Sequence, residues 1–230
     1  HSQDQSNYLK NSIEEIKNNK NNKVNVFLKK NNINNAILID LIDGLILDQK
    51  NIRIQNKEEL IKYSYHVAGT VGLMMSKILN VRNKEALKGA IDLGIAMQYT
   101  NIARDVCEDK ERNREYIKHD FSSIKTIINQ SEIFYEKSFN SISSIPLRSR
   151  FSVIVARRVY KKIGDYILKK KNTENYNKAG KIYIPAYEKI IQTFLSFYDF
   201  IKLLFVNKLN YDNHIDHIIL KEEVDLDERI

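Results

Sequence analysis

Three carboxylates and two amides share one face of residues 89–117, GAIDLGIAMQYTNIARDVCEDKERNREYI. On an ideal helix they fall within an arc of about 100°, and they are Gln98, Asn101, Asp105, Glu108 and Asp109. Oxygen ligands on successive helical turns suit Mg²⁺, which keeps several waters and joins carboxylates to substrate phosphates. The alternative is a solvent-exposed polar face, the usual place of acidic pairs four residues apart, with Arg104 or a lysine as the compensating cation.

Toward the N-terminus, the same face carries the small residues Ala90 and Gly94. The opposite side is apolar and carries Ile95, Tyr99 and Ile102. This arrangement predicts an amphipathic helix whose polar face leaves room for a ligand beside the small residues.

A second segment, YSYHVAGTVGLMMSKIL at residues 63–79, carries small residues at helical spacing: Ala68, Gly69, Gly72 and Ser76. Each glycine inside a helix costs about 1 kcal/mol, so something must approach this face closely. A neighbouring helix is the commoner cause, and a long apolar ligand is the other. We expect His66 to be a hydrogen-bonded core residue.

The apolar periodicity around these segments is helical. Asn56 and Asn83 stand where N-caps are expected. The expected helices cover residues 36–49, 58–80, 84–110, 121–143, 147–171 and 185–209. We expect an Asn/Lys-rich variable connection over residues 1–35, weak or mobile over 17–35, a helical domain over 36–209, and a charged, frayed tail over 210–230.

Composition excludes several classes of protein. Seven glycines and two prolines in 230 residues are too few for a β-sandwich or a glycine-punctuated α/β sheet. The single cysteine cannot form an intramolecular disulfide and indicates a reducing compartment. There is neither a run of about 18 apolar residues nor a secretory signal, so we expect a cytoplasmic location, with peripheral membrane contact as an option.

The net charge of +8 favours one of three partners: nucleic acid, an anionic membrane surface or a polyanionic substrate. No zinc-finger spacing, aromatic RNA-binding signature or basic heptad is present, so we expect no nucleic-acid partner.

Taken together, the two segments resemble the squalene/phytoene synthases, the head-to-head prenyltransferases, in their phytoene synthase form. The likeness lies in YSYHVAGTVGLMM, DLGIAMQYTNIARDVCED, NREYI and KIYIPAYEKI, and it runs collinearly over residues 36–205. The chain departs from the family pattern at Asn113, Lys118 and Lys181, where the family has Gly, Pro and Arg.

The resemblance implies an all-α isoprenoid synthase bundle with a central apolar cavity and Mg²⁺ as cofactor. It implies Mg²⁺-dependent condensation of two prenyl diphosphates, such as geranylgeranyl diphosphate to phytoene, through a cyclopropyl diphosphate. The implied metal ligands are Asn101, Asp105 and Asp109, and the implied catalytic residues are Asp105, Asp109 and Tyr63. The implied substrate-binding residues are Gln98, Val67, Val71, Gly72, Arg114, Tyr160 and Lys181.

One family feature is missing from the sequence: the first aspartate-rich segment, of Asp-Asp-x-x-Asp type. Asp40, Asp43 and Asp48 lie in a stretch that resembles a later part of the family. We therefore expect an N-terminally truncated chain that lacks half of the metal site. Two other hypotheses stay open: a non-catalytic relative that acts as a binding or assembly factor, and a basic helical module for nucleic acid or membrane.

Overall fold

The computed structural model describes residues 2–18, 22–206, 209 and 215–230. Every regular element in these residues is a helix, and the only strand-like contact among them is a single bridge between Arg53 and Glu115. The expectation of an all-α fold is therefore confirmed.

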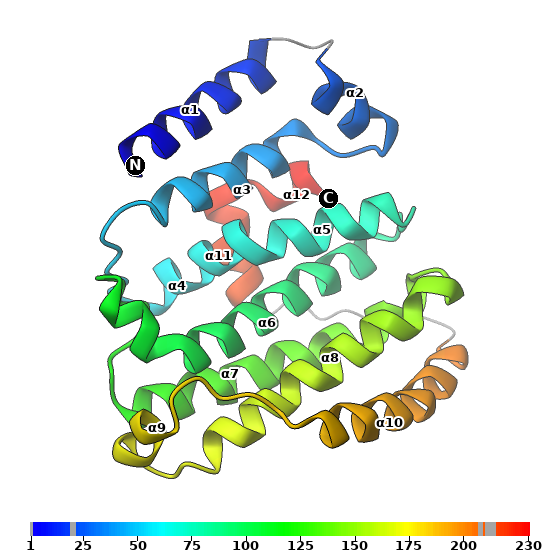
Figure 1. Ribbon diagram of the computed structural model, residues 1–230. Helices are drawn as coiled ribbons and strands as arrows, with labels where there is room; N and C mark the ends of the chain where they lie inside the picture. Colours follow the sequence, from blue (N-terminus) through cyan, green and yellow to red (C-terminus); the bar gives the residue numbers. More distant parts are fainter. Residues whose placement is uncertain (1, 19–21, 207–208, 210–214) are drawn as a thin grey trace.

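The longest helix, α6 (Lys84–Glu111), lies in the middle of the stack of helices (Figure 1). It packs against α5 (Thr70–Ile78), α7 (Phe121–Phe139) and α8 (Leu147–Leu168). Ile91, Ile95 and Tyr99 of α6 are completely buried in the main core. The segment with the acidic face is thus carried by the central helix.

The remaining elements surround this centre. On one side lie α1 (Ser2–Asn18), α2 (Lys23–Lys30), α3 (Asn35–Leu47), α4 (Lys57–Ser64) and the π-helical turn η1 (Tyr65–Gly69). On the other lie the 3₁₀ turn η2 (Asn140–Ser144), α9 (Thr173–Ala179) and α10 (Ala186–Leu204). The predicted helix over 58–80 forms as one rod, α4–η1–α5, with a widened turn inside it.

Asparagine and aspartate side chains begin many of these helices. Each accepts a hydrogen bond from the backbone N–H three residues later, which satisfies a donor that the first turn leaves unpaired. The residues are Asn22, Asn56, Asn83, Asp120 and Asn172. The caps predicted at Asn56 and Asn83 are confirmed.

The Asn/Lys-rich stretch at 17–35 is more ordered than predicted. Helix α2 forms inside it, with Leu28 buried in the core. The buried Asn25 amide donates to the Ile16 carbonyl oxygen at 2.8 Å, and its oxygen accepts a hydrogen bond from Asn35 at 3.0 Å. The prediction of a weak connection was wrong here, because composition does not reveal hydrogen bonds between distant residues. Residues 19–21 of this stretch lie outside the described residues.

The C-terminal segment is also more ordered than predicted. The described residues 215–230 form α11 (Ile215–Val224) and α12 (Leu226–Arg229), which lie behind α3, α4 and α5 in Figure 1. Leu220, Val224 and Leu226 are buried. The Arg229 guanidinium contacts the buried Asp40 carboxylate at 3.0 and 3.3 Å, and Asp40 also accepts a hydrogen bond from Tyr65 at 3.0 Å. The expectation of a frayed tail was therefore wrong for this segment; residues 210–214 lie outside the described ones.

Arg229→Ala should lower the free energy of unfolding by about 3 kcal/mol, because it leaves the buried Asp40 carboxylate without its cation. Urea denaturation measures the loss, and Arg229→Lys should lose less because it keeps the charge. A loss in Arg229→Ala no larger than that of Arg82→Ala, at the exposed Arg82, would contradict the anchoring role of this ion pair.

Candidate functional site

The π-helical turn η1 lies where the tyrosine-rich segment meets the cavity-lining part of α5. Such widened turns are rare and occur often at functional sites. His66 lies in this turn and is buried, and neither ring nitrogen has a hydrogen-bond partner among the described residues. Burial lowers the pKa of His66, so its ring is neutral at physiological pH. The expected burial is confirmed, but the expected hydrogen bond is not formed.

The small residues of α5 and α6 allow the two backbones to approach each other closely. A Cβ atom on Gly72 would overlap the carbonyl oxygen of Ala90, and one on Gly94 would overlap that of Ala68. Helix packing, the commoner of the two causes considered from the sequence, therefore explains why these positions are glycine.

Gly72→Ala should destabilise the protein by about 1–3 kcal/mol, because the backbone atoms it would meet cannot move aside cheaply. Gly164→Ala on α8 is the matched control, since its added methyl would make ordinary contacts of 3.4 and 3.5 Å with Ile128. Thermal denaturation of both variants compares the two sites. Equal melting temperatures for Gly72→Ala and Gly164→Ala would refute the close approach.

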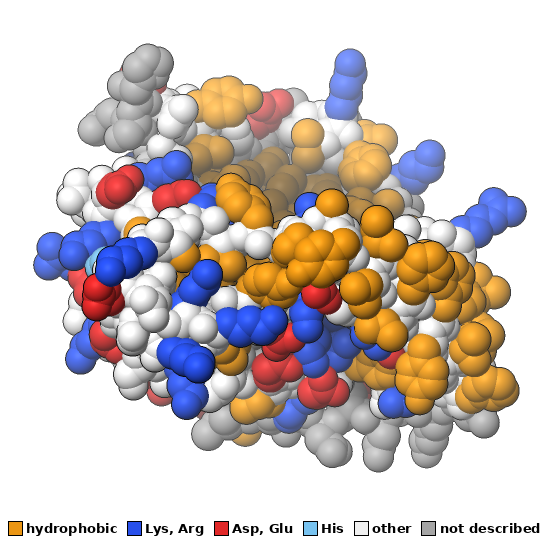
Figure 2. Space-filling view, turned by 60° about the horizontal axis from the view of Figure 1, so that its bottom comes forward, with side chains coloured by type: hydrophobic (Ala, Val, Ile, Leu, Met, Phe, Trp, Pro, Cys, Tyr) orange, Lys and Arg blue, Asp and Glu red, His pale blue; other side chains and the backbone are white. Residues whose placement is uncertain are grey.

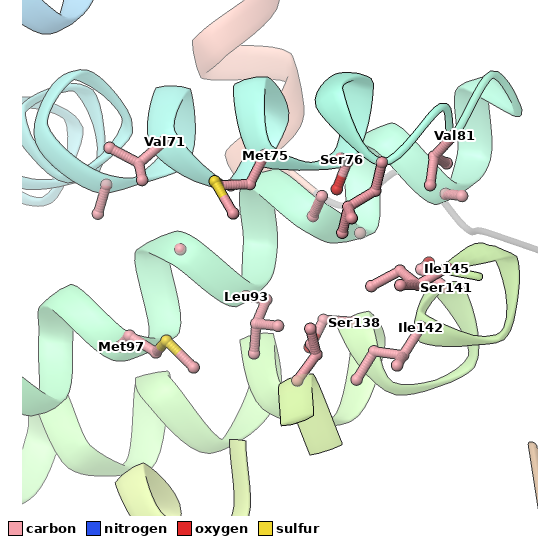
Figure 3. A pocket seen from close by; sticks show the side chains of 18 of the residues that line it. Val71, Met75, Ser76, Val81, Leu93, Met97, Ser138, Ser141, Ile142 and Ile145 are labelled. Atoms are coloured by element: carbon pink, nitrogen blue, oxygen red, sulfur yellow. The ribbon is translucent and has the colours of Figure 1, made fainter. Parts of the chain in front are cut away.

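An apolar cavity of about 400 Å³ lies beside this helix contact. The cavity is surrounded by Val71 and Met75 of α5, Leu93 and Met97 of α6, and Ile142 of η2 (Figure 3). Three further predicted substrate-binding residues line this cavity besides Val71, namely Val67, Gly72 and Gln98. The predicted metal ligand Asn101 lines it as well.

The acidic face continues from this cavity along α6. Asn101 marks the junction: it lines the cavity, and its Oδ1 atom is buried without a hydrogen-bond partner among the described residues. One turn on, Asp105 accepts two hydrogen bonds from Arg104, at 2.7 and 2.6 Å. A single helix face thus leads from apolar cavity to carboxylates.

Lys181 reaches this face from the segment before α10. Its Nζ atom lies 2.8 Å from Glu108 Oε2 and 3.5 Å from Asp105 Oδ1. Tyr160 of α8, another predicted substrate-binding residue, is partly buried and packs against the main hydrophobic core. The cations expected beside an exposed acidic pair are therefore present, and they neutralise Asp105.

Asp109 differs from Asp105 in its surroundings. Its carboxylate has no ion pair or side-chain hydrogen bond within the described part of the chain. Burial, followed by the charge of Asp105, raises its pKa to about 6, although Arg114 acts in the opposite direction. An ionised carboxylate in this position is a favourable place for a further cation.

The oxygen atoms of this face fit a Mg²⁺ ion only if substrate phosphates supply part of its ligands. No cluster of three or more His, Cys, Asp or Glu side chains suited to a metal is present in the described residues. The orphaned Asn101 oxygen and the partly buried Asp109 carboxylate are hard oxygen donors, and Mg²⁺ is commonly held by one or two carboxylates plus substrate phosphates.

Tyr63 lies in a separate hydrogen-bonded cluster. The hydroxyls of Tyr63 and Tyr116 each donate to Asp48 Oδ1 at 2.9 Å, and their rings stack with centroids 4.8 Å apart. Arg114 donates to the Asp48 backbone oxygen at 2.6 Å. Burial raises the pKa of Tyr63, which therefore stays protonated. The structure thus groups Tyr63 with Arg114 and does not place Tyr63 on the cavity wall.

From the sequence, Arg104 was one of several candidate cations for the acidic face, and its pairing with Asp105 was not predicted. The contact between Asp48 and Tyr116 was not predicted at all. Asp48 and Tyr116 are 68 positions apart, so no local signal connects them. Leu93 and Met97 were also not predicted as cavity residues, although both lie on α6 beside the small residues Ala90 and Gly94.

Known proteins resemble this chain over much of its length. The family model described as Squalene/phytoene synthase matches residues 22–121. A 15-cis-phytoene synthase of Enterobacter agglomerans is 34% identical over 150 residues, which are 56% of this chain and 51% of the relative. Phytoene synthase 1, chloroplastic, of Solanum lycopersicum is 31% identical over 180 residues, 66% of this chain and 43% of the relative.

Solved structures agree with these similarities. The crystal structure of a dehydrosqualene synthase in complex with ligand has a TM-score of 0.65 and 25% identity, covering 76% of this chain and 68% of that one. A squalene synthase from Alicyclobacillus acidocaldarius has a TM-score of 0.58 at 15% identity, covers 66% of this chain and 65% of that one, and shares the fold. The chain spans about half the length of the curated relatives it matches.

Proposed function

We propose that this chain, which belongs to the squalene/phytoene synthase family, provides one wall of the active site of a head-to-head prenyltransferase. The observation that carries the proposal is the continuous face of α6. It passes from the cavity residues Leu93 and Met97, through Asn101, to the carboxylates of Asp105 and Asp109. A prenyl diphosphate has the same two parts in the same order, an apolar chain and an anionic head.

The α6 carboxylates and Asn101 would hold the anionic head through Mg²⁺. When bound there, Mg²⁺ would neutralise the negative charge of the leaving diphosphate. Asp109 is the leading ligand because no protein cation pairs with it directly, whereas Arg104 already pairs with Asp105. Lys181 and Arg104 place positive charge beside the same face, where they would also attract the diphosphate oxygens.

The cavity would hold the prenyl chain and exclude water. Its volume of about 400 Å³ falls in the usual range for small-molecule pockets. A dry wall matters because ionisation of the allylic C–O bond leaves a carbocation that water would capture. Val71, Leu93 and Ile142 offer no nucleophilic atom to such a cation.

The chemistry we propose is the condensation of two geranylgeranyl diphosphates to phytoene. The allylic C–O bond of one substrate breaks, its diphosphate leaves, and the double bond of the other attacks the cation. Loss of a proton gives a cyclopropyl diphosphate, which loses its own diphosphate, rearranges and releases a second proton.

A second candidate is a family relative that binds or assembles without catalysis. The observation in its favour is the tight pairing of Asp105 with Arg104, which leaves that carboxylate neutralised without any metal. The two candidates differ in a simple assay of the natural full-length protein with geranylgeranyl diphosphate. An enzyme releases diphosphate and a C40 hydrocarbon, and chelation of Mg²⁺ stops the release of both. A binding factor releases neither product.

A further inference from the structure

Asp48 is the meeting point of three side chains that come from two other parts of the chain. Its Oδ1 atom accepts hydrogen bonds from the hydroxyls of Tyr63 and Tyr116, both at 2.9 Å, and its backbone oxygen accepts one from Arg114 at 2.6 Å. The two hydroxyl oxygens are themselves 3.1 Å apart. Because each hydroxyl has a single proton to donate, the Asp48 carboxylate fixes the direction in which both protons point.

This tyrosine pair lies between the acidic end of α6 and the apolar cavity. Two backbone hydrogen bonds, at 2.8 and 2.9 Å, join Glu115 to the segment that follows α3, at the left edge of Figure 1. Tyr116 borders a small space of about 10 Å³ that Asp109 also lines. Tyr63 precedes the cavity residue Val67 by about one helical turn.

The arrangement at Asp48 differs from a second contact between a carboxylate and a tyrosine in the same molecule. Asp40 accepts a hydrogen bond from Tyr65, and the Arg229 guanidinium pairs with the same carboxylate. The Asp48 carboxylate forms no ion pair within the described part of the chain, because Arg114 donates to the backbone oxygen instead. Its charge therefore acts on the two hydroxyls, and such a charge-assisted hydrogen bond makes a phenol oxygen richer in electrons.

The surface at this end of the molecule is charged. Figure 2 shows side chains of both charges toward the left, the side on which α6 ends, and mainly hydrophobic ones toward the right. Among the described residues, no helix is both long and apolar enough to cross a bilayer. The tyrosine pair thus lies at the end of α6 where the proposed function places the diphosphate.

We propose that Asp48 is a positioning residue for the condensation, an inference that rests on the proposed function. Its carboxylate holds the protons of Tyr63 and Tyr116, so the oxygen lone pairs and ring faces of the pair are left to stabilise the positive charge that develops when the diphosphate leaves. Arg114 contacts only the backbone of residue 48, so a substitution there leaves this contact in place. The Asp48 side chain therefore acts on the rate of reaction more than on substrate binding.

Steady-state kinetics of the natural full-length protein with geranylgeranyl diphosphate test this proposal. Asp48→Ala should lower kcat about a hundredfold and change KM by less than about threefold. Asp48→Asn keeps an oxygen acceptor at this position, so its loss of kcat should be only about tenfold. Asp40→Asn is the matched control, because it alters the other carboxylate that a tyrosine contacts. It should keep near-normal kcat at a temperature where the variant is folded.

A double-mutant cycle distinguishes positioning from a purely structural role. In the variant Tyr63→Phe with Tyr116→Phe, adding Asp48→Ala should cost less than about threefold in kcat, because no hydroxyl is left to orient. A full further loss in that background, equal kcat in Asp48→Ala and Asp40→Asn, or a raised KM with unchanged kcat would overturn the proposal. Absence of turnover in the wild-type protein would overturn the proposed function together with this inference, whereas an active wild type and an equally active Asp48→Ala would overturn this inference alone.

Discussion

Asp109→Asn in the natural full-length protein should lower kcat/KM for prenyl diphosphate condensation by about a thousandfold, or about 4 kcal/mol of transition-state stabilisation. The amide keeps the size of the side chain but removes the charge that would hold the metal beside the leaving diphosphate. Asp105→Asn should cause a comparable loss. Steady-state kinetics with saturating Mg²⁺ measure both.

The fold of Asp109→Asn should be at least as stable as that of wild type in metal-free buffer at pH 7. The pKa of Asp109 is raised to about 6, so the ionised carboxylate destabilises the native state relative to the unfolded chain. Its contribution to stability is present at low pH and is lost as the pH rises through the window up to about 6. Lower activity without lower stability would distinguish a ligand from a structural residue.

Glu111→Gln is the matched control for the kinetics. It makes the same carboxylate-to-amide change at an exposed position in the last turn of α6. Near-normal turnover is expected in Glu111→Gln. Near-normal turnover in both Asp105→Asn and Asp109→Asn would refute the metal-binding role of α6.

Leu93→Trp should shift substrate preference from geranylgeranyl diphosphate toward the shorter farnesyl diphosphate. Leu93 points into the cavity from α6 (Figure 3), and the larger ring would fill space that the prenyl chain needs. We expect about a hundredfold fall in kcat/KM for the longer substrate, a much smaller fall for the shorter one, and an unchanged Mg²⁺ requirement.

Ile133→Trp, at an exposed position on α7, controls for the mere presence of the ring. Parallel losses for the two substrates in Leu93→Trp would mean that the cavity does not hold the chain. A lowered melting temperature with unchanged kinetics would lead to the same conclusion.

Local patterns in the sequence were sufficient to predict much of this molecule. The helical period of residues 84–110 and the cap at Asn83 predicted α6, and its acidic face follows from spacing along one helix. The cavity positions Val67, Val71 and Gln98 were predicted from the family resemblance. Periodicity alone does not predict them, because they belong to two helices that line one space.

Long-range contacts account for what the sequence did not reveal. The position of α12 depends on the ion pair between Arg229 and Asp40, which are 189 positions apart in the chain. The position of Tyr63 is set by Asp48 and Tyr116, and the reason for glycine at position 72 is the Ala90 carbonyl of another helix. None of these pairings has a local signal in the chain.

The most direct measurement of the central claim is a crystal structure of the protein with Mg²⁺ and a non-reactive geranylgeranyl thiodiphosphate. The account predicts Mg²⁺ about 2.1 Å from an Asp109 oxygen, with the diphosphate as its other ligand. It further predicts the prenyl chain in the cavity that α5, α6 and η2 line, against Leu93 and Met97. A diphosphate held away from α6, with no metal on Asp105 or Asp109, would contradict it.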